Sequence, residues 1–206
     1  MSDHLFELLT VRLTSTAGAP DEVPAELRER LVTRATADHL LDVVYRVVDS
    51  PLGPLLLAAT DSGVVRVAFA AQDHDAVLED LSHRLGPRVL RTESGLDELA
   101  RQLDDYFAGT RSSIEVPLDL RLAHGFRRQV LEHLREIPFG RTETYAEVAQ
   151  GAGSPRAVRA VGSACATNPV PIIVPCHRVV RTDGSMGGYL GGSDAKAWLL
   201  ALEAAA

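Results

Sequence analysis

The residues best suited to chemistry lie in one short segment, where a proline-rich stretch ends in a cysteine followed by a histidine. Three of the eight residues 168–175 are proline, and Cys176 and His177 follow directly. Proline fixes the backbone angle φ and removes an amide donor, so this stretch is stiff and extended rather than helical. A stiff approach to a Cys-His pair suits a thiol nucleophile that must be held ready for attack.

The spacing of the pair indicates how a proton would move. Side chains of adjacent residues do not face each other on a helix and point to opposite faces in a strand. We therefore expect a water molecule, rather than a direct contact, to connect the Cys176 thiol with the His177 imidazole. Glu203, in the last predicted helix, is the candidate for orienting His177 in the manner of the third member of a catalytic triad. The alternative is a buried structural thiol beside an ordinary surface histidine, since free cysteines are most often buried and inert.

Cysteine usage excludes several other kinds of site. The chain has two cysteines, Cys165 and Cys176, which is too few for a disulfide framework or a cysteine-rich zinc site. No further Cys or His lies at ligand spacing from the pair, so we expect neither a metal nor a cofactor. Cys165 is interpreted as a small buried residue. The single thiols, a start without signal-peptide features and the lack of a long apolar run predict a cytoplasmic protein that does not contact a membrane.

The elements that must position the Cys-His pair begin with a small sheet. Short apolar runs at 43–48, 55–59 and 64–69, separated by turns rich in Gly, Pro and Asp, predict an antiparallel meander. Apolar side chains at helical spacing then predict two helices, within 77–85 and 96–107. Residues 42–120 are therefore expected to form an α/β N-terminal domain, a small antiparallel sheet with helices, together with a linker.

The remaining residues, 121–206, predict a mostly α-helical C-terminal domain. Apolar stripes indicate helices that include Phe126 and Tyr145, and Ser154-Pro155 is expected to cap a further helix over 156–166. The last two helices, joined by a turn that contains glycine, match a helix-turn-helix.

Residues 1–41 form an N-terminal extension of unassigned role. A short helix is expected around residues 25–35. The extension is either an added helical element packed on the first domain or partly disordered.

The net charge of −7 argues at first against nucleic-acid binding. Its distribution argues the other way, because residues 1–120 hold 11 Lys and Arg against 21 Asp and Glu, whereas residues 121–182 hold 9 against 4. A basic segment that carries both the helix pair and the Cys-His pair suits the phosphate backbone of DNA. The acidic N-terminal domain is expected to make no DNA contact.

Ordered sequence blocks around Cys176 resemble the O6-alkylguanine-DNA alkyltransferases, also called methylated-DNA–protein-cysteine methyltransferases. The active-site signature of that family is matched by Pro175-Cys-His-Arg-Val-Val180. The resemblance covers residues 43–206 and includes further blocks in the family's order: Asp49-Ser-Pro-Leu-Gly53, Gly140-Arg-Thr-Glu-Thr-Tyr145, Arg156-Ala-Val-Arg-Ala-Val-Gly162, Asn168-Pro-Val-Pro171, Gly188-Tyr-Leu-Gly-Gly192 and Leu199-Leu-Ala-Leu-Glu203. It implies DNA repair by a protein that acts once. The sequence leaves the oligomeric state open, and one monomer bound to DNA is the default expectation.

The resemblance implies a role for each member of a catalytic set. Cys176 would accept the alkyl group from O6 of a flipped guanine in double-stranded DNA, or from O4 of thymine. His177 would draw the thiol proton through water, and Glu203 would orient His177. Tyr145 would donate to the guanine ring as O6 loses its alkyl group. Asn168 would brace the active-site turn through backbone hydrogen bonds.

The same resemblance places the helix pair in the minor groove, where small side chains allow close approach and little sequence is read. Arg159 would fill the gap left by the flipped base. The residues expected to contact DNA are Arg156, Arg159, Ala160, Gly162, Ser163 and Tyr145. The residues expected to line the substrate pocket are Pro171, Val179, Tyr189, Leu190 and Lys196, with the carbonyls of Cys176 and Val179 reading the guanine edge. The resemblance implies that Lys196 anchors the loop or the pocket, and the alternative is an exposed helix charge.

The sequence departs from the family pattern at two positions and in one motif. Leu190 stands where many members carry Ser, which removes a hydroxyl contact unless the backbone amide makes it. Leu131 stands where Trp is common, which indicates altered core packing. The N-terminal domain also lacks the cysteine pair with which some members bind zinc.

Two functions from other classes compete with alkyl transfer. A non-catalytic reader of damaged bases would not need the acceptor thiol, so the presence of Cys176 argues against it. A thiol hydrolase acting on a small ester or amide would not need Arg159 or a basic helix pair.

Overall fold

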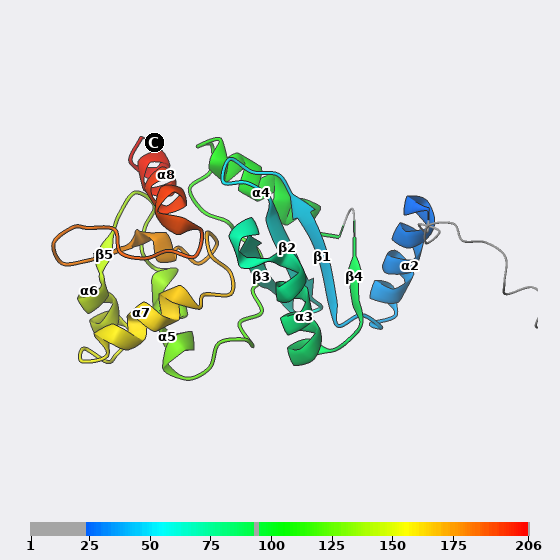
Figure 1. Cartoon of the computed structure of the whole chain (residues 1–206), viewed down its shortest axis with the longest axis horizontal. Helices are drawn as coiled ribbons and strands as arrows, with labels where there is room; N and C mark the ends of the chain where they lie inside the picture. Colours follow the sequence, from blue (N-terminus) through cyan, green and yellow to red (C-terminus); the bar gives the residue numbers. More distant parts are fainter. Residues whose placement is uncertain (1–23, 93–94, 206) are drawn as a thin grey trace, which may run out of the picture.

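The computed structural model describes residues 24–92 and 95–205 of the 206-residue chain. An N-terminal sheet with its helices lies next to a C-terminal group of helices (Figure 1). The fold class expected from the sequence is therefore confirmed. The expectations for residues 1–23 lie outside the described residues.

The N-terminal sheet has its strands in the order β3-β2-β1-β4. Strands β1 (Val43–Val48), β2 (Leu55–Thr60) and β3 (Gly63–Phe69) form the expected antiparallel meander. The fourth strand, β4 (Val89–Arg91), pairs parallel with β1, so the sheet is mixed rather than purely antiparallel. The sequence does not indicate β4, because a run of three residues is too short to show the periodicity of a strand.

Two helices cover opposite faces of this sheet. Neighbouring side chains of β2 point to opposite faces. Leu56 packs in the cluster that includes α3 (His74–Leu85), whereas Leu57 packs in the cluster that includes α4 (Asp97–Phe107). A 3₁₀ turn, η1 (Ala70–Gln72), connects β3 to α3.

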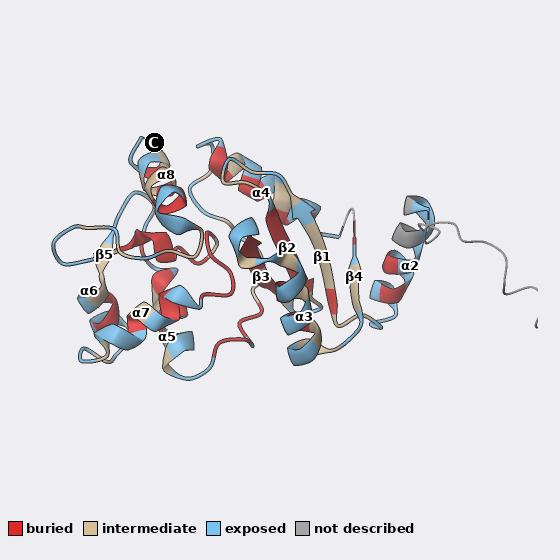
Figure 2. Cartoon of the chain, viewed as in Figure 1, coloured by how far each residue is buried: buried red, intermediate tan, exposed pale blue. Residues whose placement is uncertain are grey.

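The C-terminal domain is mostly helical, as expected. Its elements in chain order are α5 (Phe126–Leu134), β5 (Glu143–Thr144), α6 (Tyr145–Gly151), α7 (Val158–Ala166), the 3₁₀ turn η2 (Cys176–Arg178), β6 (Val179–Val180) and α8 (Gly192–Ala205). Strand β5 pairs parallel with β6, which brings the start of α6 beside the η2 turn. The chain around η2 is buried (Figure 2). Leu131 on α5 is fully buried, so the position where Trp is common belongs to the core.

Helix α7 begins later than the sequence predicts. Ser154 and Pro155 belong to a turn in which the Ala157 amide donates to the Ser154 carbonyl at 2.8 Å. Ala157 is the N-cap, and it provides no side-chain cap. The cap expected at Ser154 is therefore wrong, because this turn separates the serine from the helix. Arg156 consequently lies in the turn and not on α7.

The two domains meet along the outer edge of β3. Val64 forms a bridge with Leu118 of the linker, and the Val67 amide donates to the Pro169 carbonyl at 2.8 Å. These contacts cover an edge strand whose free hydrogen-bonding groups would otherwise be exposed. They also fix the chain that leads to the Cys-His pair directly against the N-terminal sheet.

The extension contributes helix α2 (Ala25–Ala37), close to the helix expected there. It lies beside β4, at the end of the sheet away from the C-terminal domain (Figure 1), and it buries Val32 and Ala35. Within residues 24–92 and 95–205, no helix combines the length and the apolar character that crossing a membrane requires.

Candidate active site

Cys176 begins the η2 turn, and only 2% of it is exposed. The buried side chain of Asn168 holds this turn together. Its Nδ2 donates to the Val174 carbonyl at 2.8 Å and lies 3.2 Å from Sγ of Cys176. Its Oδ1 accepts from the Val170 amide at 3.0 Å. One amide group therefore fixes both the backbone of the turn and the position of the thiol.

His177 is fully buried and faces Glu203 of α8. Its Nε2 lies 2.8 Å from Oε1 of Glu203. A neutral imidazole that donates from Nε2 keeps Nδ1 as a proton acceptor, and Nδ1 has no hydrogen-bond partner among the described residues. The thiol of Cys176 contacts Asn168 and not the imidazole, so this arrangement suits a proton path through water.

Two residues that sequence reasoning missed complete the surroundings of Glu203. Tyr106 of α4 donates to Oε1 at 2.5 Å, and Nε of Arg178 donates to both carboxylate oxygens, at 3.1 and 3.0 Å. The Gly140 amide adds a bond to Oε2 at 3.0 Å. Arg178 lies inside the motif Pro175-Cys-His-Arg-Val-Val180, so its place in that motif was a signal for a role in the site. Tyr106 comes from the other domain and has no local motif that marks it.

Burial sets the protonation state of this cluster. It raises the pKa of Cys176 to about 11 and lowers the pKa of His177 below its ordinary value. Burial alone would raise the pKa of Glu203, but hydrogen bonds from His177, Arg178 and Tyr106 lower it to about 2. At neutral pH the cluster therefore holds a protonated thiol, a neutral imidazole that can take its proton, and a carboxylate.

Tyr145 is the first residue of α6. It lies against the loop of residues 184–191 before α8, which contains four glycines. A side chain at Gly187 would come within 2.8 Å of the Tyr145 hydroxyl, and Gly187 has a φ of +63°, so glycine is required there. Burial raises the pKa of Tyr145, and the neighbouring Cys165 and Cys176 act in the same direction. The hydroxyl therefore keeps its proton and can donate it.

Lys196 is buried, which contradicts the interpretation as an exposed charge. Its Nζ donates to the Val179 carbonyl at 2.6 Å and also to the Met186 carbonyl. Lys196 thus anchors the loop to the strand that follows η2. The Cys176 carbonyl likewise accepts a bond, from the Val179 amide.

The other expected pocket residues lie in different places. The ring of Tyr189 packs edge-on at 6.1 Å from His177 and at 5.6 Å from Phe69 of β3, measured between centroids. Pro171 is buried in the turn before Cys176. Leu190 instead lines a cavity at the domain junction together with several arginines.

Four of the six residues expected to contact DNA lie on α7, whereas Arg156 lies in the turn before it and Tyr145 begins α6. Arg159, Ala160 and Ser163 are exposed, and Gly162 is partly exposed. A Cβ atom at Gly162 would meet no other atom within 4 Å, so packing within the described structure does not require glycine there. Glycine inside a helix destabilises by about 0.5–1 kcal/mol relative to alanine.

Cys165 of α7 is a second free thiol, and burial raises its pKa to about 12. A thiol with such a pKa is a poor nucleophile at neutral pH. No group of three His, Cys, Asp or Glu side chains in the described part of the chain is placed to hold a metal ion.

The fold and this cluster define a protein that buries a thiol held by Asn168 and exposes small residues on one side of α7. Residues 43–120 match the family model described as 6-O-methylguanine DNA methyltransferase, ribonuclease-like domain, and residues 125–205 match its DNA binding domain. The chain belongs to the 6-O-methylguanine DNA methyltransferase family, as the sequence blocks predict.

Named relatives agree with this assignment. The methylated-DNA–protein-cysteine methyltransferase of Methanosarcina acetivorans is 40% identical over 159 residues, covering 77% of this chain and 97% of the relative. That of Mycolicibacterium paratuberculosis is 41% identical and covers 78% and 92%. The crystal structure of Mycobacterium tuberculosis OGT in complex with DNA matches with a TM-score of 0.70 and 38% identity, covering 79% of this chain and 93% of that one.

Proposed function

We propose that the protein repairs DNA by moving an alkyl group from O6 of guanine, or from O4 of thymine, in double-stranded DNA to its own Cys176. Its relatives are named for methyl transfer from DNA to a protein cysteine. In the transfer, Sγ bonds to the alkyl carbon while the carbon–oxygen bond breaks. The thiol proton passes through water to Nδ1 of His177, Tyr145 donates a proton to the departing guanine, and the proton held by His177 then returns to Tyr145 through solvent. The products are a thioether and guanine, so each molecule acts once.

One observation carries this proposal. The thiol of Cys176 is held by Asn168 beside a buried His177 whose Nε2 is bound to Glu203 and whose Nδ1 has no partner among the described residues. A thiol whose pKa burial raises to about 11 needs a base at the moment of attack. The imidazole is the base that the site offers.

The exposed side of α7 is the proposed DNA-binding surface. In a helix-turn-helix formed by α6 and α7, Gly162 would allow the helix backbone to approach the minor groove closely. Arg159, which is exposed on α7, would occupy the space of the flipped base. Arg156, Ala160 and Ser163 lie on or beside this surface and would contact the duplex.

The test uses a short duplex that contains one O6-methylguanine. We expect a single methyl mass on the peptide that contains Cys176, formed in a burst with one equivalent per protein. Cys176→Ser should abolish transfer and retain DNA binding, because the thiol is buried behind the binding surface. Repeated turnover, or an unmodified Cys176, would contradict the acceptor mechanism.

We also propose that the protein acts as a monomer in the cytoplasm. Both of its cysteines are free, which suits a reducing compartment. One active site and one DNA-binding surface lie on the same chain. Sedimentation of the protein with and without duplex measures the stoichiometry, and cell fractionation measures the location.

A further inference from the structure

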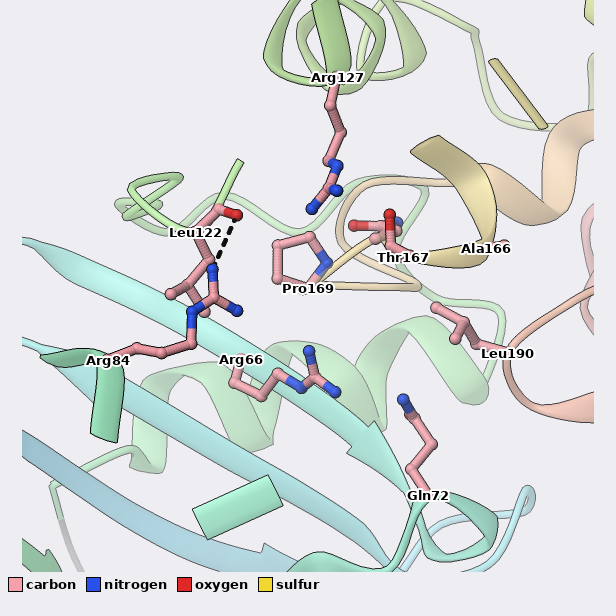
Figure 3. Close-up of a pocket in the computed structure, with 10 residues that line it drawn as sticks. Arg66, Gln72, Arg84, Leu122, Arg127, Ala166, Thr167, Pro169 and Leu190 are labelled. Carbon is pink, nitrogen blue, oxygen red and sulfur yellow. Dashed lines mark hydrogen bonds between the residues drawn. The ribbon is translucent and has the colours of Figure 1, made fainter. Parts of the chain in front are cut away.

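A cavity of about 250 Å³ lies at the junction of the two domains and is lined by three arginines and no acidic residue. The guanidinium groups of Arg66 from β3, Arg84 from α3 and Arg127 from α5 point into it from three sides (Figure 3). The other lining residues are Gln72, Leu122, Ala166, Thr167, Asn168, Pro169 and Leu190. The site is therefore strongly positive and is built by both domains.

The three positive charges at this cavity are only partly compensated by acidic side chains. Nε of Arg66 is buried without a hydrogen-bond partner, and neither Arg66 nor Arg127 forms an ion pair with any described residue. Arg84 pairs with Asp80 at 3.4 Å and donates to the Leu122 carbonyl at 3.3 Å. Burial lowers the pKa of Arg66, the nearby Asp80 charge partly offsets this, and the charge of Arg84 lowers the pKa further. Three guanidinium groups face one cavity that no carboxylate lines, so a bound anion would lower the repulsion between them.

Resting on the proposed function, we propose that this cavity binds a phosphate group of the DNA backbone. Guanidinium groups are planar forks of donors that match the oxygens of a phosphate. Oε1 of Gln72 already accepts from the Phe69 amide at 3.0 Å, which leaves its NH₂ group as a further donor for the anion. No carboxylate lines the cavity to repel it.

The position of the cavity favours DNA as the source of the phosphate. Arg84 and Arg127 also line an adjoining hollow of about 520 Å³ that reaches Ala160 and Ser163 on the exposed side of α7. Ala166 and Thr167, at the end of α7, border the arginine-lined cavity itself. A duplex on the exposed side of α7 would carry its backbone past this opening. The acidic N-terminal domain would then contact DNA through Arg66 and Arg84, contrary to the expectation from its net charge.

The experiment measures the salt dependence of binding to an unmodified duplex by the full-length protein, between 50 and 200 mM salt. Each phosphate contact contributes about 0.9 to the slope of log affinity against log salt. We expect Arg66→Gln and Arg127→Gln each to lower that slope by about one. The parental protein should then lose roughly three- to four-fold more affinity than either variant over this range. Arg101→Gln, on the exposed surface of α4, is the matched control and should keep the parental slope.

The outcomes separate this inference from the proposed function. If the parental protein shows no salt-dependent duplex binding, the proposed function fails. If the parent binds but both variants keep its slope, only the phosphate site is wrong. A second experiment measures thermal unfolding with added inorganic phosphate. The phosphate should raise the melting temperature of the parental protein and should not raise that of Arg66→Gln. Stabilisation by inorganic phosphate with an unchanged DNA slope would assign the cavity to a free anion and overturn the proposal. Circular dichroism of each variant verifies folding.

Discussion

The hydroxyl of Tyr106 donates to the same carboxylate oxygen of Glu203 that contacts Nε2 of His177, at 2.5 Å and 2.8 Å respectively. Tyr106 belongs to α4 of the N-terminal domain, whereas Glu203 belongs to α8 of the C-terminal domain. Both residues are buried. The orientation of the His177 imidazole therefore depends on how the two domains pack against each other.

We expect Tyr106→Phe to act on His177 through Glu203. Without the Tyr106 hydroxyl, Oε1 of Glu203 interacts more strongly with the His177 imidazole. The protonated imidazole is then stabilised, and the pKa of His177 rises from its depressed value. The acid limb of the pH–rate profile, where alkyl transfer slows because His177 becomes protonated, should consequently move to higher pH. A hydrogen bond to a charged group contributes about 1.5–3 kcal/mol, so the free energy of unfolding should fall by a similar amount. Stopped-flow rates across pH and urea denaturation measure the two effects.

Tyr45→Phe is the control for this prediction, because it removes a hydroxyl from β1 of the same domain. It should leave the acid limb in place. An unchanged acid limb in Tyr106→Phe, together with lower stability, would reduce Tyr106 to a structural residue.

The raised pKa of Cys176 predicts an unusual pH profile for the parental protein. If titration of the thiol supplied the nucleophile, a pKa of about 11 would make the rate rise about ten-fold per pH unit between pH 7 and 9. If neutral His177 takes the proton during attack, the rate should be nearly level over this range. It should fall only in acid, below the ordinary histidine pKa, because burial lowers the pKa of His177. Single-turnover rates with the O6-methylguanine duplex decide between the two.

Gly162→Ala should separate stability from DNA binding. The added methyl group meets no atom within 4 Å, so the helix should gain about 0.5–1 kcal/mol from the better helix former. Affinity for duplex DNA should nevertheless fall, because the methyl group lies between α7 and the minor groove. Thr33→Ala, exposed on α2, is the matched control and should gain stability with no change in affinity. Undiminished binding by Gly162→Ala would show that close approach is not the reason for this glycine.

The sequence predicts local structure better than it predicts the site's partners. The meander and the two N-terminal helices follow from alternation and helical spacing within short segments. The expected extended course up to Pro175 is wrong, because the chain turns before Cys176 and the Val174 amide donates to the Val170 carbonyl. Tyr106 lies 97 residues from Glu203, so only the packed domains bring them together. The arginine-lined cavity has the same origin, because Arg66, Arg84 and Arg127 come from three elements of two domains. Net charge summed along the chain does not show where such side chains converge.

The depressed pKa of Glu203 predicts a specific loss of stability in acid. Its pKa is about 2 in the folded protein and about 4.5 when unfolded, so its contribution is fully present above pH 4.5 and is lost as the pH falls toward 2. Glu203→Gln removes the charge that faces His177 and Arg178, and loss of one partner of a buried ion pair costs about 3–5 kcal/mol. The parental protein should therefore be more stable than Glu203→Gln at pH 7, and the difference should shrink between pH 4.5 and 2.5. Urea denaturation of both proteins at several pH values measures it. A difference that stays constant down to pH 2.5 would mean that Glu203 is not held as a carboxylate by its neighbours.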